Sequence, residues 1–224
     1  MRVIEQLQSA EVPSQRSTLS SALWSLEAVI AHWFLKSPPA HLPRRLNLGC
    51  GTTFAAGWIN ADFATLRSMI RGNIRLPEWN MDATRQWHCP DAYFEAIHCE
   101  HVLEHFPYAT SIRVLRECHR TLQPGGVLRV SVPDLRRYVD YYEGKQMPTR
   151  FQQLGSGPVA MSKLTQCHRH VSVWDGPLMQ SALQELGFAE VAEASFMRTR
   201  MSLPCIDNPD REWESVYVEG IKPG

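Results

Sequence analysis

The stretch RRLNLGCGTTFAAGWINADF, residues 44–63, decides the fold. It begins as a short strand that ends on Leu48 and is stopped by a Gly-Cys-Gly turn at residues 49–51. A second strand is predicted over residues 58–63, with Asp62 near its end. Glycines directly after a strand let the backbone approach a ligand closely, and open α/β sheets bind ligands beyond the carboxyl ends of their strands. We therefore predict a ligand-binding loop at residues 49–51.

Strands and helices alternate along the rest of the chain. Strand patterns recur at residues 79–81, 93–99, 127–132, 189–195 and 215–219, and apolar residues show helical spacing at 110–122 and 178–186. Such alternation indicates a mostly parallel sheet that is covered on both faces. We predict one Rossmann-like, doubly wound α/β domain over residues 44–224, with a seven-stranded sheet.

Two segments stand apart from this alternation. Residues 1–43 are predicted to be a helical extension, because residues 17–36 carry apolar side chains at helical spacing and Pro38-Pro39 follows them. We expect this helix to pack against the main domain, with a homodimer contact through it as the alternative. Residues 144–176 lack a clear period and are longer than a typical connection, so we expect a substrate loop there.

Composition narrows the classes of partner and compartment. Lys plus Arg and Asp plus Glu both number 23, and this balance disfavours nucleic acid, whose binding usually needs a basic excess. The six cysteines include no Cys-x-x-Cys pair and indicate reduced thiols. No uncharged apolar run reaches the ~18–20 residues that span a bilayer. We expect a cytoplasmic protein without stable membrane insertion.

Two carboxylates follow predicted strands at positions that suit a nucleoside. Asp62 ends the second strand, where it can accept hydrogen bonds from both hydroxyls of a ribose. Asp82 ends the third strand, where it can accept one from an adenine amino group. Either acid alone is as readily a loop or cap residue. Their order behind a glycine loop favours a nucleoside site.

Five segments carry a resemblance to class I S-adenosylmethionine-dependent methyltransferases. They are LNLGCG (46–51), INADF (59–63), NMDAT (80–84), YFEAIHCEHVLEHF (93–106) and LRECHRTLQPGGVLRVSVPD (115–134). The chain most resembles bacterial methyltransferase-like proteins with a shortened first helix, many of them associated with surface-polysaccharide biosynthesis. The resemblance implies an S-adenosylmethionine-dependent enzyme that acts on a small molecule or a glycan intermediate.

The resemblance also implies roles for individual residues. The glycine loop would line the methionine moiety of the cofactor, Asp62 would hold the ribose, and Asp82 with the amide of Ala83 would recognise adenine. Residues after the fourth strand would flank the methionine end. The cofactor-binding set is Gly49, Cys50, Gly51, Asp62, Asp82, Ala83, Glu100 and His101.

The chain departs from the usual pattern between the glycine loop and the ribose acid. Asp62 follows Gly51 by only 11 positions, whereas dinucleotide-binding folds separate the two by ~20 residues. Residues 52–58 can form a turn at most, so we predict that the first helix is missing or shortened. This argues against a nicotinamide dinucleotide, whose pyrophosphate needs that helix. S-adenosylmethionine carries no phosphate and tolerates the loss.

A competing interpretation is a zinc hydrolase. His101, Glu104 and His105 form an H-x-x-E-H string, in which two histidines could bind zinc and the glutamate could act as base. A long helix should carry such a motif, yet Phe106-Pro107 follows immediately. Cys167-His168-Arg169-His170 offers further ligand types but no second pair at finger spacing. No metal site is predicted.

Methyl transfer needs alignment of the two reactants, and also a base when the acceptor is a hydroxyl or an ammonium. Histidine suits that task near neutral pH. His168 and His170 lie in the expected substrate loop, and His105 is the next candidate. The alternative to an enzyme is a non-catalytic module that binds the cofactor or a partner.

Overall fold

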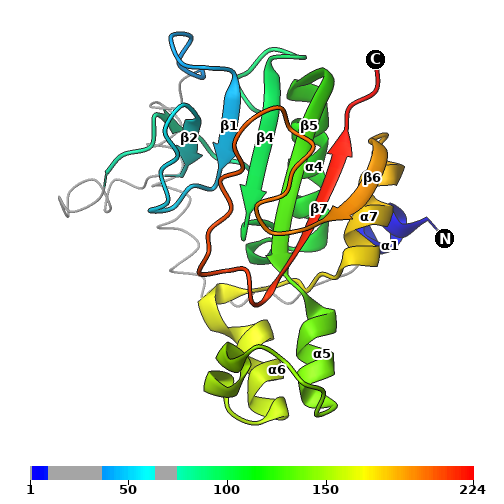
Figure 1. Ribbon diagram of the computed structural model, residues 1–224. Helices are drawn as coiled ribbons and strands as arrows, with labels where there is room; N and C mark the ends of the chain where they lie inside the picture. The colour runs from blue at the N-terminus through cyan, green and yellow to red at the C-terminus, as the bar shows by residue number, and fades with distance from the viewer. Residues whose placement is uncertain (1, 10–36, 64–74) are drawn as a thin grey trace, which may run out of the picture.

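The computed structural model describes residues 2–9, 37–63 and 75–224, and its centre is a seven-stranded sheet (Figure 1). The strand order is β3-β2-β1-β4-β5-β7-β6; β7 pairs antiparallel with β5 and with β6, and the other described strand pairs are parallel. This confirms the predicted Rossmann-like, mostly parallel sheet. The strands are β1 (Arg45–Leu48), β2 (Ile59–Asp62), β3 (Trp79–Asn80), β4 (Phe94–Glu100), β5 (Leu122–Pro133), β6 (Ala189–Ala194) and β7 (Ser215–Ile221).

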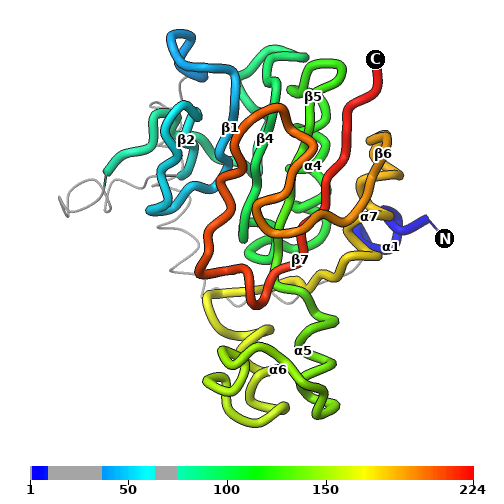
Figure 2. Tube along the Cα trace, viewed as in Figure 1, coloured from blue at the N-terminus to red at the C-terminus, as the bar shows by residue number. Residues whose placement is uncertain are grey.

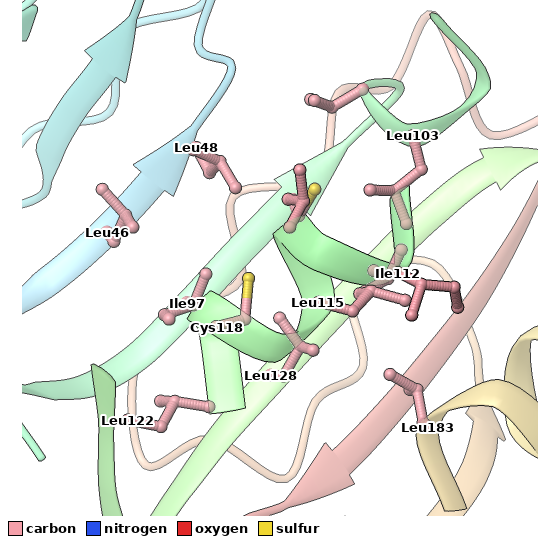
Figure 3. Packing of buried hydrophobic residues seen from close by; sticks show 14 of the residues in the cluster. Leu46, Leu48, Ile97, Leu103, Ile112, Leu115, Cys118, Leu122, Leu128 and Leu183 are labelled. Carbon is pink, nitrogen blue, oxygen red and sulfur yellow. The ribbon is translucent and has the colours of Figure 1, made fainter. Parts of the chain in front are cut away.

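Three helices lie together on one face of the sheet: α1 (Val3–Ser9), α4 (Tyr108–Thr121) and α7 (Gly176–Glu185). The apolar stripe of α4 points into the core, where Ile112, Leu115 and Cys118 are fully buried (Figure 3). The amides of Val3 and Ile4 donate to the Glu185 carboxylate on α7 and tie α1 to this layer. The predicted helix at 17–36 and its dimer contact lie outside the described residues.

The opposite face of the sheet is covered by the connection between β6 and β7, residues 195–214. It crosses in front of β4 and β5 before the chain returns as β7 (Figure 2). Arg129 on β5 attaches this connection to the sheet. Its guanidinium donates to the carbonyl oxygens of Ser195 and Arg198 and to the Asp207 carboxylate.

Residues 144–176 are not the aperiodic loop that the sequence predicted. Together with α5 (Leu135–Tyr142) they form a small helical lobe beyond the carboxyl end of β5, made of η2 (Thr149–Leu154), α6 (Gly157–Gln166) and η3 (Cys167–Arg169). The lobe has its own apolar cluster around Tyr138, Phe151 and Leu164. Its helices are short and bury side chains against one another, so no long amphipathic stripe marks them in the sequence.

Residues 49–58, all of which the structure describes, contain turns and no helix. This confirms that the first helix of the fold is missing. Of the helices in the described parts of the chain, none has the length and apolar character needed to cross a membrane.

Candidate active site

The glycine loop lies at the carboxyl end of β1 and leaves no room for a side chain at its first position. Gly49 has φ +68°, and a Cβ there would lie 2.3 Å from Cγ2 of Val102. The amides of Gly49 and Cys50 both donate to the carbonyl oxygen of Ala61, at 2.8 and 3.1 Å. The loop is therefore fixed between β2 and the segment that follows β4.

Asp62 reaches the same loop from the end of β2. Its Oδ2 accepts from the Gly51 amide at 2.6 Å, and its Oδ1 accepts from the Phe63 amide at 2.6 Å. Each carboxylate oxygen has a further lone pair, so the group can still accept hydrogen bonds from hydroxyls of a ligand. Burial raises the pKa of the Cys50 thiol to about 12, so this cysteine is a neutral part of the loop.

Two buried asparagines hold the turn that replaces the missing helix. Asn47 Nδ2 donates to Asn60 Oδ1 at 2.8 Å and to the carbonyl oxygen of Thr53 at 2.9 Å. Asn60 also accepts from the amide of Ala55 and donates to its carbonyl oxygen. Sequence reasoning missed both asparagines; the signal was their polarity at core positions of two apolar strands.

Asp82 and Ala83 lie just after β3, as predicted, but are engaged in a turn. The Asp82 carboxylate accepts from the amide and hydroxyl of Thr84 and from Nε of Arg85. The carbonyl oxygen of Ala83 accepts from the Trp87 indole. The turn places an acid beside β2, and the part these residues play in reading adenine remains a prediction.

Glu100 ends β4 and His101 follows it, and both contact the chain that leads to β7. The carboxylate of Glu100 accepts from the amide of Asn208 at 3.1 and 3.2 Å. His101 has φ +52°, and its Nε2 lies 2.7 Å from the Ser215 hydroxyl. That hydroxyl donates its hydrogen to the carbonyl oxygen of Arg211, so it must accept from His101 Nε2–H.

The other nitrogen of His101 faces a buried glutamate. His101 Nδ1 lies 3.2 Å from Oε1 of Glu104, whose side chain is 2% exposed. Burial opposes ionisation of Glu104, but the nearby His101 and His105 outweigh it and lower the pKa of the carboxyl.

The three histidines predicted to be catalytic lie together, and His105 and His170 lie close to Glu104. The rings of His105 and His170 meet edge to face with centroids 5.1 Å apart, and the His168 ring lies 5.9 Å from that of His170. His170 Nδ1 lies 2.8 Å from the carbonyl oxygen of Leu164. Since a carbonyl only accepts, Nδ1 carries the hydrogen and Nε2 keeps its lone pair. Burial lowers the pKa of His170, which favours this neutral form.

The geometry expected for the zinc-hydrolase motif is absent. Of the motif residues 101–105, all of which the structure describes, only Leu103–His105 is helical, as the 3-10 turn η1. His101 has left-handed backbone angles. His101 and His105 therefore do not lie one turn apart on a helix. Glu104 and His105 meet His170 instead.

A pocket on the same strands lies far from this chemistry. It is lined by Glu95, Ala96, Val127 and residues 200–203, near the amino ends of β4 and β5. The glycine loop and the histidine cluster lie at the carboxyl ends. We therefore place the candidate site at the carboxyl edge, where the described side chains carry the relevant groups.

Comparison with known proteins gives a consistent picture. A family model described as a methyltransferase domain matches residues 32–193. An S-adenosylmethionine-dependent methyltransferase structure from Archaeoglobus fulgidus is 15% identical, with a TM-score of 0.50 over 89% of this chain and 94% of that one. The protein PH0226 from Pyrococcus horikoshii OT3 is 16% identical, with a TM-score of 0.50 over 93% and 92%.

The S-adenosylmethionine-dependent methyltransferase SibL is 15% identical, with a TM-score of 0.52 over 100% of this chain and 63% of that one. At such identities these likenesses show the fold alone. No curated protein matches the chain significantly.

Proposed function

The chain belongs to the methyltransferase-domain family, and on that premise we propose that it methylates a hydroxylated small molecule or glycan intermediate with S-adenosylmethionine. The observation that carries the proposal is the contact between the glycine loop and the acid of β2. The Gly51 amide donates to Asp62 at 2.6 Å, and Gly49 has no space for a side chain against Val102. A backbone without side chains, next to a carboxylate, can bind a ligand that joins a ribose to an amino-acid chain.

The residues at this edge fit the cofactor chemically. S-adenosylmethionine supplies, when bound, an electrophilic methyl group on a sulfonium. Asp62 would accept the hydroxyls of the ribose, and the loop at Gly49–Gly51 would lie along the methionine part. Cys50 stays a thiol because burial raises its pKa to about 12, so it does not compete as a nucleophile. Asp82 and Ala83 would border the adenine, with Glu100 and His101 at the methionine end.

The acceptor would lie between the end of β4 and the helical lobe. Val102 packs on Gly49, and three residues further along the chain His105 contacts His170. The cofactor loop and the histidine cluster are thus joined by one short segment. We assign the reacting hydroxyl to the neighbourhood of His105, His168 and His170, with the lobe at residues 144–176 as the acceptor-binding element.

Charge and the lobe surface support the proposed class of acceptor. Acidic and basic residues balance at 23 each, which disfavours a polyanionic substrate. Tyr142 on α5 is 58% exposed, and an exposed aromatic face suits packing against a sugar ring. A glycan intermediate agrees with the resemblance to polysaccharide-associated methyltransferases.

The test is cofactor binding by isothermal titration calorimetry. We expect S-adenosylmethionine or its demethylated product to bind with micromolar affinity, about −8 kcal/mol. Asp62→Ala should weaken binding by ~1.5–3 kcal/mol, the range for hydrogen bonds to a charged group. Asp91→Ala is the matched control, because Asp91 is 77% exposed and lies before β4 at the opposite edge of the sheet.

Two results would count against the proposal. Unchanged affinity in Asp62→Ala would remove that carboxylate from the ribose site. Tight cofactor binding without methyl transfer to any of a panel of hydroxylated acceptors would favour a non-catalytic module instead.

A further inference from the structure

We propose that Glu104, His105 and His170 form a divalent-cation site of the zinc type. Each residue offers one ligand atom, and the three atoms lie within 4.8 Å of one another. Two imidazoles and a carboxylate are the protein ligands of many catalytic zinc sites, in which a fourth position stays open. The site takes one histidine from the end of η3, which is distant in sequence, and so differs from the helical H-x-x-E-H arrangement.

The strongest support is the environment of Glu104. Its side chain is 2% exposed, and neither carboxylate oxygen accepts a well-formed hydrogen bond from any residue that the structure describes. His101 Nδ1 approaches Oε1 to 3.2 Å, but on one side only and without hydrogen-bond geometry. A buried carboxylate left in this state is costly. A cation shared with His105 and His170 would remove the cost.

His170 is already oriented as a metal ligand. Its Nδ1–H donates to the Leu164 carbonyl oxygen at 2.8 Å, and metal-binding histidines typically anchor their second nitrogen in this way. The lone pair of Nε2 is left for a cation. His105 completes the set from the exposed side, where its ring meets that of His170.

The backbone brings the two halves of the site together before any ligand arrives. The amides of Val171 and Ser172 donate to the carbonyl oxygen of Glu104 at 2.8 and 3.2 Å. His168 and Arg169 hold positive φ angles of +54° and +65° in the turn that leads to His170. Such strained conformations persist where the surrounding structure fixes them and often mark functional sites.

A second group of ligand types lacks this character. His98, Glu100 and Asp207 also lie close together. There, however, Asp207 accepts from the Arg129 guanidinium and Glu100 accepts from the Asn208 amide. The carboxylates of that group have hydrogen-bond partners, unlike the carboxylate of Glu104. Its unpartnered member is His98, whose ring nitrogens accept or donate no hydrogen bond among the described residues.

The cation would act on the acceptor, and this part rests on the proposed function. Its open position would hold an oxygen of the acceptor and favour loss of the hydroxyl proton to water. The cation would also occupy Nε2 of His170, so that nitrogen could not serve as a base at the same time. The acceptor site would then hold the reacting oxygen on the cation.

The experiment measures cation binding directly, without acceptor or cofactor. Chelator-treated protein is titrated with Co²⁺ and then with Zn²⁺ in competition. We expect one ion per chain and the visible absorption of a four-coordinate Co²⁺ complex. We expect His105→Ala and Glu104→Gln each to weaken binding at least ~10–100-fold, the loss seen even when a residue that only hydrogen-bonds to a metal ligand is replaced. His105 is exposed, so its substitution should leave the fold intact.

The control is His41→Ala, which removes an exposed histidine before β1, at the opposite edge of the sheet. It should bind the ion as the wild type does. Wild-type protein that binds no Co²⁺, or His105→Ala and Glu104→Gln variants that bind it unchanged, would overturn the site. Calorimetry of the wild-type protein with S-adenosylmethionine separates the two proposals. A wild type that binds Co²⁺ but no S-adenosylmethionine would contradict the methyltransferase function and leave the cation site in place.

Discussion

At the scale of single residues, Gly49 and Gly51 differ in what one added methyl group would meet. A Cβ there would overlap Cγ2 of Val102, whereas a Cβ at Gly51 would meet no described atom within 4 Å. Both glycines have positive φ, at +68° and +52°. The two alanine variants therefore share the backbone cost and differ in the collision.

We expect Gly49→Ala to lose more stability than Gly51→Ala, by the ~1–3 kcal/mol of an overpacked site. Adding Val102→Ala to the first variant should recover part of the loss. Urea denaturation measures the stabilities, and calorimetry with S-adenosylmethionine measures the affinity. Equal losses in the two single variants would show that the contact with Val102 is unimportant.

The sequence predicted Gly49 and Asp62 because their meaning is local, with a turn after one strand and an acid at the end of the next. It could not predict that Glu104 meets His170. That contact depends on a lobe that folds between β5 and α7 and on amides of residues 171 and 172 that bind the Glu104 carbonyl oxygen. Such pairings across the chain leave no periodic trace.

At the scale of elements, the turn between β1 and β2 shows how the fold survives the loss of a helix. The short spacing from Gly51 to Asp62 predicted that loss. The substitute was not predicted, because a side-chain network between Asn47 and Asn60 is visible only once the two strands pair. The helical lobe was missed for the same reason, since its core around Phe151 is assembled from several short helices.

We expect Asn60→Ala to destabilise the protein and loosen the glycine loop. The change removes an acceptor for the Ala55 amide and for Asn47 Nδ2, both buried or half-buried donors. Unsatisfied groups of this kind cost about 1–3 kcal/mol each. The free energy of unfolding and the cofactor affinity should therefore both fall.

The control for this variant is Asn208→Ala, whose side chain accepts a local hydrogen bond from the Asp210 amide. It should change the free energy of unfolding much less. If both variants unfold at the same denaturant concentration as the wild type, the asparagine pair does not hold the turn.

At the scale of the whole molecule, the mostly parallel seven-stranded sheet was predicted, but the covering of its front face was not. The connection at 195–214 has no apolar period. It packs Met201 against Trp58 and Val127, and it is also attached by a buried charge cluster. Arg129 lies fully buried on β5 and binds Asp207 of this connection and Glu219 of β7. One cation thus ties together two strands and the segment that crosses them.

This cluster predicts how stability depends on pH. Burial of Asp207 opposes its charge, but hydrogen bonds and attraction from Arg129 outweigh this and lower the pKa of the carboxyl below its ordinary value. A group whose pKa is lower in the folded state adds stability above its unfolded pKa, about 3.9. That contribution is lost as the pH falls through the folded value.

We therefore expect the difference in free energy of unfolding between wild type and Asp207→Asn to be largest near pH 7. There the variant should lose about 3–5 kcal/mol, the cost of breaking a buried ion pair. The difference should hold down to about pH 4 and shrink below it, because the wild-type carboxylate then begins to take up a proton. Urea denaturation at a series of pH values gives the two curves. The control is Asp91→Asn, because Asp91 is exposed and pairs with Arg120 at the surface; its free energy of unfolding should follow that of the wild type at every pH. A difference that stays constant down to the acid limit of folding would mean that the Asp207→Asn substitution perturbs packing and that the Arg129 charge pair contributes no pH dependence.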